Sequence, residues 1–363
     1  SSRWLKAPPL QGSAGAARFS FKTMPCAVCE GAGRLLLNVC PLCDGVIGWP
    51  DAEELGYAMS ADASATFARA SMPTDGMSIL SWNLLNPDTI GLANKDNPHY
   101  NHLQDEERFW EHRWPRILAE IQLADATVVC LQEINKGLYE EIRDALGSLG
   151  YASVTHRKPQ RNCLAIFYKS DTAAKVWEKH VRIKGFEKTL AVGLKCTGRV
   201  LAVVTCHLEG HPQKTAERLA QLEATFKEVK ELQHEGIVIA GDFNAPLAED
   251  GRWSAVSAYL LHGMIPNGTT EWGRDVVVPL GALQPHGYAF ESAYGPGPVF
   301  SISLHGEGPS LIDHIWYSRC LALAGVRDVF FDASFREEVL RHGLPNKQNP
   351  SDHLPLGVVL RWL

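Results

Sequence analysis

Short apolar runs recur along the chain from about residue 77 onward, separated by polar or glycine- and proline-rich stretches. Their β-branched and aliphatic composition predicts buried strands. The predicted strands are Met77–Leu85, Ala126–Leu131, a strand from Tyr151, Leu164–Tyr168, Val200–Cys206, Ile237–Ala240, Leu311–Tyr317 and Leu356–Leu360. Apolar residues at helical spacing predict helices over Glu106–Leu123, Lys136–Leu149 and Gln213–Gln233. This alternation of strands and helices predicts the α/β class.

Polar side chains stand inside these predicted strands, after them or, in the case of Asp352 and His353, just before the last one. They are Asn83, Glu133, His207, Asp242, Asn244, Asp313, Asp352 and His353. Each one alone has an ordinary explanation, such as a capped turn, a satisfied buried amide or a solvated loop acid. Because ligands of open α/β sheets bind outside the carboxyl ends of strands, the repetition indicates a common site.

The motifs around these residues carry a family resemblance. Six short sequence motifs follow one another between Met77 and Leu363: SWNLL, CLQEI, TCHLE, GDFNAP, LIDHIWYS and PSDHLP. In that order they resemble the endonuclease/exonuclease/phosphatase superfamily. The stretches ERFWEHRWPRILAEI, VCLQE and AIFYK resemble its branch of CCR4-type deadenylases, nocturnin and 2′-phosphodiesterases. The resemblance implies a four-layer α/β/β/α sandwich of two mixed sheets.

The resemblance also implies roles for the polar residues. Hydrolysis of a phosphoester needs its negative charge neutralised. Asp242 would orient or deprotonate water and Asn244 would position it, while His207 would donate to a phosphate oxygen. His353 paired with Asp313 would stabilise the transition state. The expected metal, Mg2+ or Mn2+, would be held by Glu133, Asn83 and Asp352.

Four cysteines near the start of the chain form two C-x-x-C pairs, Cys26 with Cys29 and Cys40 with Cys43. The strand-like stretch Arg34–Val39 lies between them, so two knuckles joined by a hairpin would give a closed four-thiolate site for structural Zn2+. The first pair, with its following glycines, resembles the zinc module of DnaJ-type chaperones. The other interpretation is a redox-active dithiol. We expect no catalysis from this module, which could bind a protein partner.

The whole chain of 363 residues carries a formal net charge of −6, so no global basic field favours nucleic acid. No apolar run approaches the roughly 18 residues that span a bilayer. An anionic RNA or nucleotide substrate would therefore depend on the metal and on a local basic loop, for which Arg157, Lys158 and Arg161 are candidates. That loop could equally be an ordinary solvated turn.

The first acidic residue is Glu30, and the acid-poor, Ser- and Arg-containing stretch before it resembles an organellar transit-peptide remnant or a linker. We expect a plastid or mitochondrion over the cytoplasm. The expected organisation is a leader or linker (1–23), the zinc module (24–48), a linker (49–76) and the catalytic domain (77–363). The five cysteines outside the zinc module lie mostly in apolar runs and are expected to be inert core residues.

The most specific prediction is a 3′-exoribonuclease of the deadenylase kind. Two departures weaken poly(A) as the substrate: Arg161-Asn162-Cys163 stands where deadenylases have Asp-Gly, and the aromatic nearest before Asp313 is Phe300. The alternatives are a nucleotide phosphatase of the nocturnin kind, a catalytically silent scaffold subunit, and a thiol-dependent chaperone acting through the paired cysteines. The Gly/Pro-rich stretch Pro266–Pro309 is predicted to be a long functional loop.

Overall fold

The computed structural model describes residues 4–6, 34–35, 38–39, 76–90, 97–156, 161–183, 186–276, 283–295, 299–327, 329–330 and 333–363. The four cysteines of the expected zinc module, nearly all of the linker expected after it and most of the basic loop lie outside these residues. Within the described ranges, no helix is both long and apolar enough to cross a membrane.

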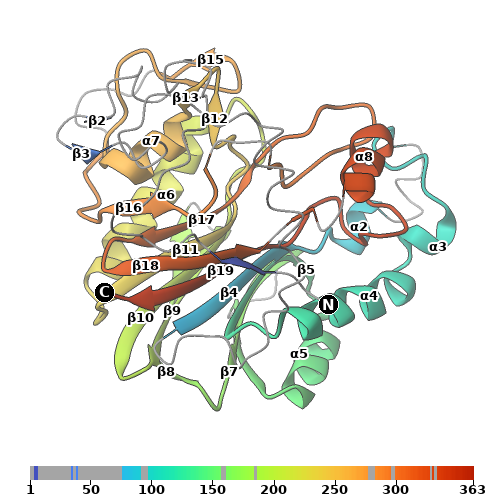
Figure 1. The fold of residues 1–363 in the computed structure, drawn as a ribbon, viewed down its shortest axis with the longest axis horizontal. Helices are drawn as coiled ribbons and strands as arrows, with labels where there is room; N and C mark the ends of the chain where they lie inside the picture. Colours follow the sequence, from blue (N-terminus) through green and yellow to red (C-terminus); the bar gives the residue numbers. More distant parts are fainter. Residues whose placement is uncertain are drawn as a thin grey trace, which may run out of the picture.

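Two mixed β-sheets form the centre of the protein (Figure 1). In spatial order the 7-stranded sheet contains β1 (Trp4–Lys6), β18 (Leu321–Arg327), β19 (Leu356–Trp362), β4 (Gly76–Asn83), β5 (Val128–Asn135), β7 (Asn162–Lys169) and β6 (Tyr151–Thr155). The 6-stranded sheet contains β16 (Phe290–Ser292), β17 (Asp313–Ser318), β11 (Gly236–Asp242), β10 (Arg199–His207), β9 (Phe186–Cys196) and β8 (Ala173–Ile183). Among the strand pairs that the structure describes, β4–β5 and β10–β11 are the parallel ones, so the carboxyl ends of the two strands in each pair point the same way.

The apolar residues of the first sheet alternate between two cores. Ile79 and Val128 pack with residues of the second sheet, whereas Leu80 and Val129 belong to a separate cluster formed with the helices that cover the other face. This period of two follows from the pleat, which sends successive side chains to opposite faces. Because both faces are covered, these strands read as continuous apolar runs in the sequence.

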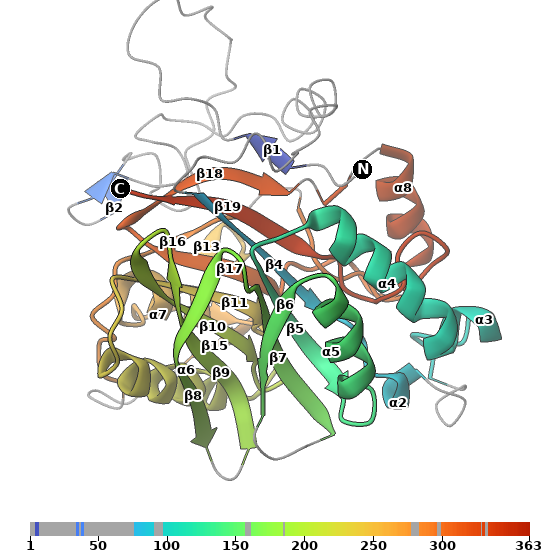
Figure 2. The same ribbon diagram turned by 90° about the horizontal axis from the view of Figure 1, so that it is seen from below.

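Helices cover the outer face of each sheet. Figure 2 shows α4 (Trp110–Ala124) and α5 (Tyr139–Ser148) on one side of the two sheets and α6 (Thr215–Lys230) and α7 (Ala255–His262) on the other. The predicted four-layer α/β/β/α sandwich is therefore confirmed. The other helices of the described ranges are α2 (Pro87–Ile90), α3 (Asp105–Arg108) and α8 (Ala333–His342).

Several elements were not predicted from the apolar pattern. The long hairpin of β8 and β9 is absent from the predicted strands; in β8 charged residues interrupt the apolar ones, and most of its side chains are exposed or half-exposed. Helices α7 and α8 were also missed. The helix expected over Glu106–Leu123 is divided at Phe109 into α3 and α4. The long loop expected at Pro266–Pro309 contains the short hairpin β14 (Thr270–Glu271) and β15 (Arg274–Asp275) and then β16.

Short elements connect the rest of the chain to these sheets. In the segment expected to be a leader or linker, β1 pairs antiparallel with β18. Between the two cysteine pairs, β2 (Arg34–Leu35) and β3 (Asn38–Val39) form an antiparallel ladder, where a hairpin was expected. A two-stranded ladder of β12 (Ala248–Glu249) and β13 (Arg252–Trp253) precedes α7.

Candidate active site

Three of the predicted residues form a row across the second sheet. His207 at the end of β10 lies opposite Asp242 at the end of β11, and Asp242 lies opposite Asp313 at the start of β17. Residues directly opposite one another in a sheet project from the same face. The strands approach closely here, since a Cβ placed on Gly241 would lie 2.1 Å from the carbonyl oxygen of Cys206. Glycine at 241 therefore permits the β10–β11 contact that brings His207 beside Asp242.

The two carboxylate oxygens of Asp242 accept hydrogen bonds from different groups. Oδ1 accepts a hydrogen bond from the backbone N–H of Asn244 at 2.8 Å, which stabilises a turn with Asn244 in the left-handed region at φ 50°. Oδ2 accepts from Asn83 Nδ2 at 3.0 Å. Burial, followed by the charge of Asp313, raises the pKa of Asp242 above its usual value. The Asp242 carboxylate thus stabilises the turn through one oxygen and contacts the site residue Asn83 through the other.

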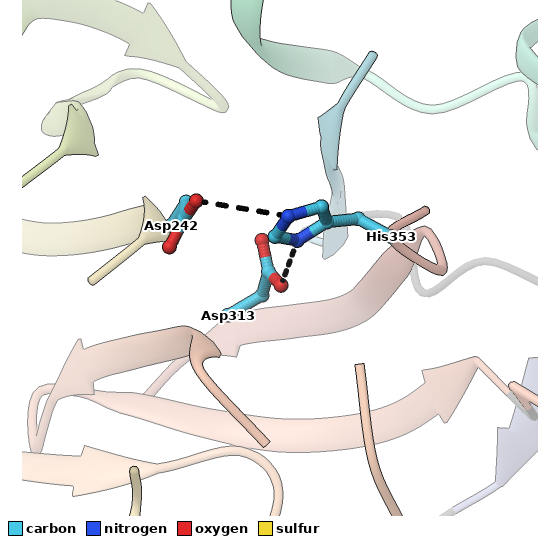
Figure 3. A group of neighbouring side chains, drawn as sticks. All are labelled: Asp242, Asp313 and His353. Atoms are coloured by element: carbon cyan, nitrogen blue, oxygen red, sulfur yellow. Dashed lines mark hydrogen bonds and ion pairs between the residues drawn. The ribbon is translucent and has the colours of Figure 1, made fainter. Parts of the chain in front are cut away.

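His353 forms a close pair with Asp313 (Figure 3). Its Nδ1 lies 2.7 Å from Asp313 Oδ2, and its Nε2 lies 3.9 Å from both Asp242 Oδ2 and Asp352 Oδ1. Burial opposes protonation of the ring, but the charges of Asp313, Asp352 and Asp242 outweigh it and raise the pKa of His353 well above its usual value. The ring is therefore an imidazolium surrounded by carboxylates, and its Nε2–H faces the centre of the site.

Glu133 enters the site from the first sheet through an irregularity of β5. The pairing of β5 with β7 shifts register between Leu131 and Ile134, and Glu133 has φ 57°, in the left-handed region. Such a bulge re-aims a side chain. Glu133 Oε2 accepts from the backbone N–H of Asn86 at 2.8 Å. Burial, and then the charge of Asp352, raise the pKa of Glu133.

His207 lies between Glu133 and Asp242. Its Nε2 is 3.7 Å from Glu133 Oε1 and 3.6 Å from Asp242 Oδ2. Burial lowers the pKa of His207 to about 4; Asp242 opposes this shift, whereas the positive charge of Lys188 adds to it. His207 is therefore neutral at pH 7, in contrast to His353. A neutral imidazole can donate from one nitrogen and accept at the other.

Two residues that the sequence did not predict hold the Asp352 end of the site. The Tyr100 hydroxyl donates to Asp352 Oδ2 at 2.6 Å, and burial, with the adjacent Asp352 charge, raises the pKa of Tyr100 so that it stays protonated. Arg113, fully buried on α4, donates from Nε to the Pro350 carbonyl at 2.6 Å and from Nη2 to the carbonyls of Leu84 and Leu85. It thereby joins the backbone after Asn83 to the backbone before Asp352.

The family model described as "Endonuclease/Exonuclease/phosphatase family" matches residues 80–353, which include all of this cluster. The chain belongs to the endonuclease/exonuclease/phosphatase family. The description of this family names endonucleases, exonucleases and phosphatases, all of which hydrolyse phosphoester bonds, so the family-level reaction is hydrolysis of a phosphoester bond. The family expectation drawn from the strand-end motifs is thus confirmed.

Relatives within this family include nocturnin and angel homologues. Nocturnin from Rattus norvegicus is 26% identical over 301 residues, covering 77% of this chain and 64% of the relative. "Protein angel homolog 2" from Bos taurus is 31% identical over 192 residues, covering 46% of this chain and 34% of the relative. The matches thus span between a third and two thirds of these relatives' own lengths.

Solved structures agree on the family fold. The structure of "ANGEL2, a 2′,3′-cyclic phosphatase" in complex with adenosine-2′,3′-vanadate aligns with a TM-score of 0.66 and 24% identity, over 79% of this chain and 96% of that one. The catalytic domain of human nocturnin with a bound sulfate anion aligns with a TM-score of 0.56 and 19% identity, over 80% and 96%. These likenesses establish the sandwich fold of the family.

The donor set of this family site fits a hard divalent cation. Glu133 and Asp352 offer carboxylate oxygens, which Mg2+ prefers. The negative charge of Asp352 raises the pKa of Glu133, and a cation bound between the two carboxylates would remove this repulsion. Asn83 Oδ1 already accepts from the Leu85 N–H at 3.0 Å. By distance alone, Asp242, Asp313 and His353 could also hold a metal, since their ligand atoms lie within 4.8 Å of one another. His353 Nδ1 and Asp313 Oδ2 already engage each other at 2.7 Å, which favours the Glu133 and Asp352 position.

The structure brings together every strand-end residue predicted from the sequence. Asn83 contacts Asp242 and also hydrogen-bonds the Glu133 side chain, while Asn244 Nδ2 donates to the carbonyl of Leu208 at 3.1 Å. Arg157 and Lys158 lie outside the described residues. Arg161 is largely exposed, with Nε 3.7 Å from Asp88 Oδ2. The roles assigned to all these residues, including metal and substrate binding, remain predictions.

Proposed function

We propose that this chain is a metal-dependent phosphohydrolase that removes nucleotides from the 3′ end of RNA. The observation that carries the proposal is the convergence of one protonated imidazole, one neutral imidazole and four carboxylates at the ends of strands from both sheets. Such a cluster is costly to bury unless it performs chemistry. The nocturnin and angel relatives support the same reaction class.

The charge of each side chain suggests its role in the reaction. Asp242 would accept a proton from the attacking water, and its raised pKa makes it a stronger base than an exposed aspartate. Asn83 would orient the Asp242 carboxylate through its 3.0 Å hydrogen bond. When bound, Mg2+ would neutralise charge on the phosphoryl oxygens. The bond that breaks joins phosphorus to the 3′ oxygen of the preceding nucleotide.

The two histidines would act on the phosphate itself. The His353 imidazolium, fixed by Asp313 at 2.7 Å, would direct its Nε2–H at the oxygens that gain charge in the transition state. The neutral His207 would donate a hydrogen bond to another oxygen. Because Tyr100 occupies Asp352 Oδ2, a cation would bind at Oδ1, which accepts a long hydrogen bond of 3.5 Å from Ser351 Oγ.

A second candidate function is hydrolysis of a terminal 2′,3′-cyclic phosphate. It is favoured by the 31% identity to angel homolog 2 and by the fold shared with the ANGEL2 structure, which is described as a 2′,3′-cyclic phosphatase. The same water attack would open the cyclic ester, so the two candidates differ in the substrate that the cleft accepts. A nucleotide phosphatase of the nocturnin kind would differ in the same way.

The test is degradation of a 5′-labelled RNA ending in adenylates, in Mg2+ and in EDTA. The variants are Asp242→Asn and, as a matched control, Asp144→Asn, which changes a carboxylate 70% exposed on α5. Progressive 3′ shortening in Mg2+, lost in EDTA and in Asp242→Asn but retained in Asp144→Asn, supports the exoribonuclease. An intact RNA chain excludes it.

Parallel reactions separate the remaining candidates. Conversion of an RNA with a 2′,3′-cyclic end, without shortening, would select the cyclic phosphatase. Turnover restricted to a dinucleotide phosphate would select the nucleotide phosphatase. No turnover of any of the three substrates in Mg2+ or Mn2+ would leave the scaffold hypothesis.

A further inference from the structure

The row of site residues across the second sheet continues one strand further than the predicted site. Strand β9 pairs antiparallel with β10, and Thr189 lies opposite Cys206. The next position on each strand brings Lys188 beside His207. Four neighbouring strands thus contribute Lys188, His207, Asp242 and Asp313 in sequence across the sheet.

A bulge accompanies Lys188. On the other side of β9, Val181 of β8 lies opposite Thr189 and Arg182 lies opposite Glu187, so Lys188 is the extra residue in this ladder. An unpaired bulge residue is one whose side chain has been re-aimed relative to a regular strand. The positive charge of Lys188 acts on His207 and helps to lower the pKa of its imidazole. Register and charge therefore agree that the Lys188 ammonium lies on the site side.

Lys188 has no carboxylate partner, in contrast to the lysines and the arginine of the neighbouring strand β8. Three neighbours are ion-paired: Lys175 with Glu178, Lys179 with Glu228 and Arg182 with Glu187. Lys188 is half-buried and has no carboxylate within 4.0 Å in the part of the chain that the structure describes. An ammonium that has lost part of its hydration without gaining a partner is available to an anion.

We propose that Lys188 binds a second phosphate group of the substrate, next to the one that is hydrolysed. The inference rests on the proposed function, since it assumes that the scissile phosphate lies between His207 and His353. The carboxylates at the centre of the row repel an anion, and a lysine at its end supplies a compact positive charge that phosphates bind. The substrate class is then an oligonucleotide or a nucleotide with more than one phosphate, rather than a lone phosphate ester.

The kinetic test compares three dinucleotides with the same scissile bond: ApA, pApA and ApAp. The variants are Lys188→Gln, Lys188→Arg and, as a control, Lys195→Gln, which changes an exposed lysine near the other end of β9. Loss of a charged hydrogen bond predicts that Lys188→Gln raises KM about tenfold for pApA or ApAp. KM for ApA should not change, Lys188→Arg should recover most of the loss, and Lys195→Gln should behave as wild type.

Equal losses on all three dinucleotides would overturn the proposal, because they would show a general electrostatic effect. No loss on any of them would overturn it as well. A binding measurement keeps the proposal testable if the proposed reaction itself fails. Calorimetry in Mg2+ should show that adenosine 3′,5′-bisphosphate binds wild type more tightly than adenosine 5′-monophosphate does, and that Lys188→Gln removes the difference. A retained difference refutes the Lys188 subsite, whereas a wild type that turns over no substrate refutes only the proposed function.

Discussion

Arg218 and Glu271 form a fully buried ion pair that braces the loop after His207. Both side chains are 0% exposed, and Glu271 Oε1 accepts from Arg218 Nη2 at 2.6 Å and from Nε at 3.0 Å. Arg218 also donates to the carbonyls of Glu209, His211 and Pro212. The pair therefore connects α6, the hairpin of β14 and β15, and the chain that leaves the active site.

Glu271→Gln is expected to lower the free energy of unfolding by about 3–5 kcal/mol, because it leaves the Arg218 charge buried without a counter-charge. Arg218→Met should cost at least as much, since it also leaves three loop carbonyls without their donor. The double variant Arg218→Met/Glu271→Leu should cost less than the sum of the single variants, because no isolated charge remains.

Urea unfolding followed by tryptophan fluorescence measures these free energies at pH 7. Activity of each variant, measured where it is still folded, reports on the loop. Glu271→Gln should lose less activity than Arg218→Met, which alone loses the contacts to the loop. A single variant that costs under about 1 kcal/mol, or a double variant whose cost is the sum of the singles, would refute the reasoning.

Three further predictions concern single side chains. Gly241→Ala should prevent folding or lower the free energy of unfolding by more than about 3 kcal/mol, because its Cβ would lie 2.1 Å from a backbone oxygen. Gly147→Ala, in open space on α5, should instead raise the free energy of unfolding by about 0.5–1 kcal/mol. Thermal unfolding measures both effects, and a tolerated Gly241→Ala would contradict the close approach of the strands. Tyr100→Phe should lower kcat and raise the Mg2+ concentration needed for half-maximal activity, because Asp352 loses a 2.6 Å hydrogen bond; an unchanged Mg2+ titration would count against this positioning role. Burial lowers the pKa of His314 to about 4. As pH falls from 6.5 toward 4, wild type should therefore lose stability relative to His314→Gln, by up to about 1.4 kcal/mol per pH unit. Urea unfolding of both proteins at pH 7 and pH 5 measures this difference.

The sequence predicted the strand-end residues well because each lies within or close to an apolar run that is buried on both faces. Asp242 and Asp313 stand out for this reason. The sequence did not predict how Glu133 is aimed, since β5 continues past it and only a register shift turns the side chain into the site. Strand periodicity alone carries no signal for such a bulge.

The residues that hold the predicted ones in place could not be found in this way. Tyr100 and Asp352 are 252 residues apart, and nothing near either of them indicates the contact. Lys188 was missed for a different reason. It lies before the buried apolar run Leu190–Leu194 of β9, and no pattern in the sequence marks a lysine at the start of such a run as part of a site.

The position of β19 has a consequence for the order in which the protein folds. This strand lies between β18 and β4 in the first sheet, and its first residue, Leu356, pairs with Ser81. During synthesis β4 is made long before its neighbour, and such distant pairings close slowly. Asp352 and His353 lie just before β19, so a chain in which this strand has not yet paired with β4 lacks part of the proposed catalytic centre. Hydrolysis would then begin only once the sheet has closed.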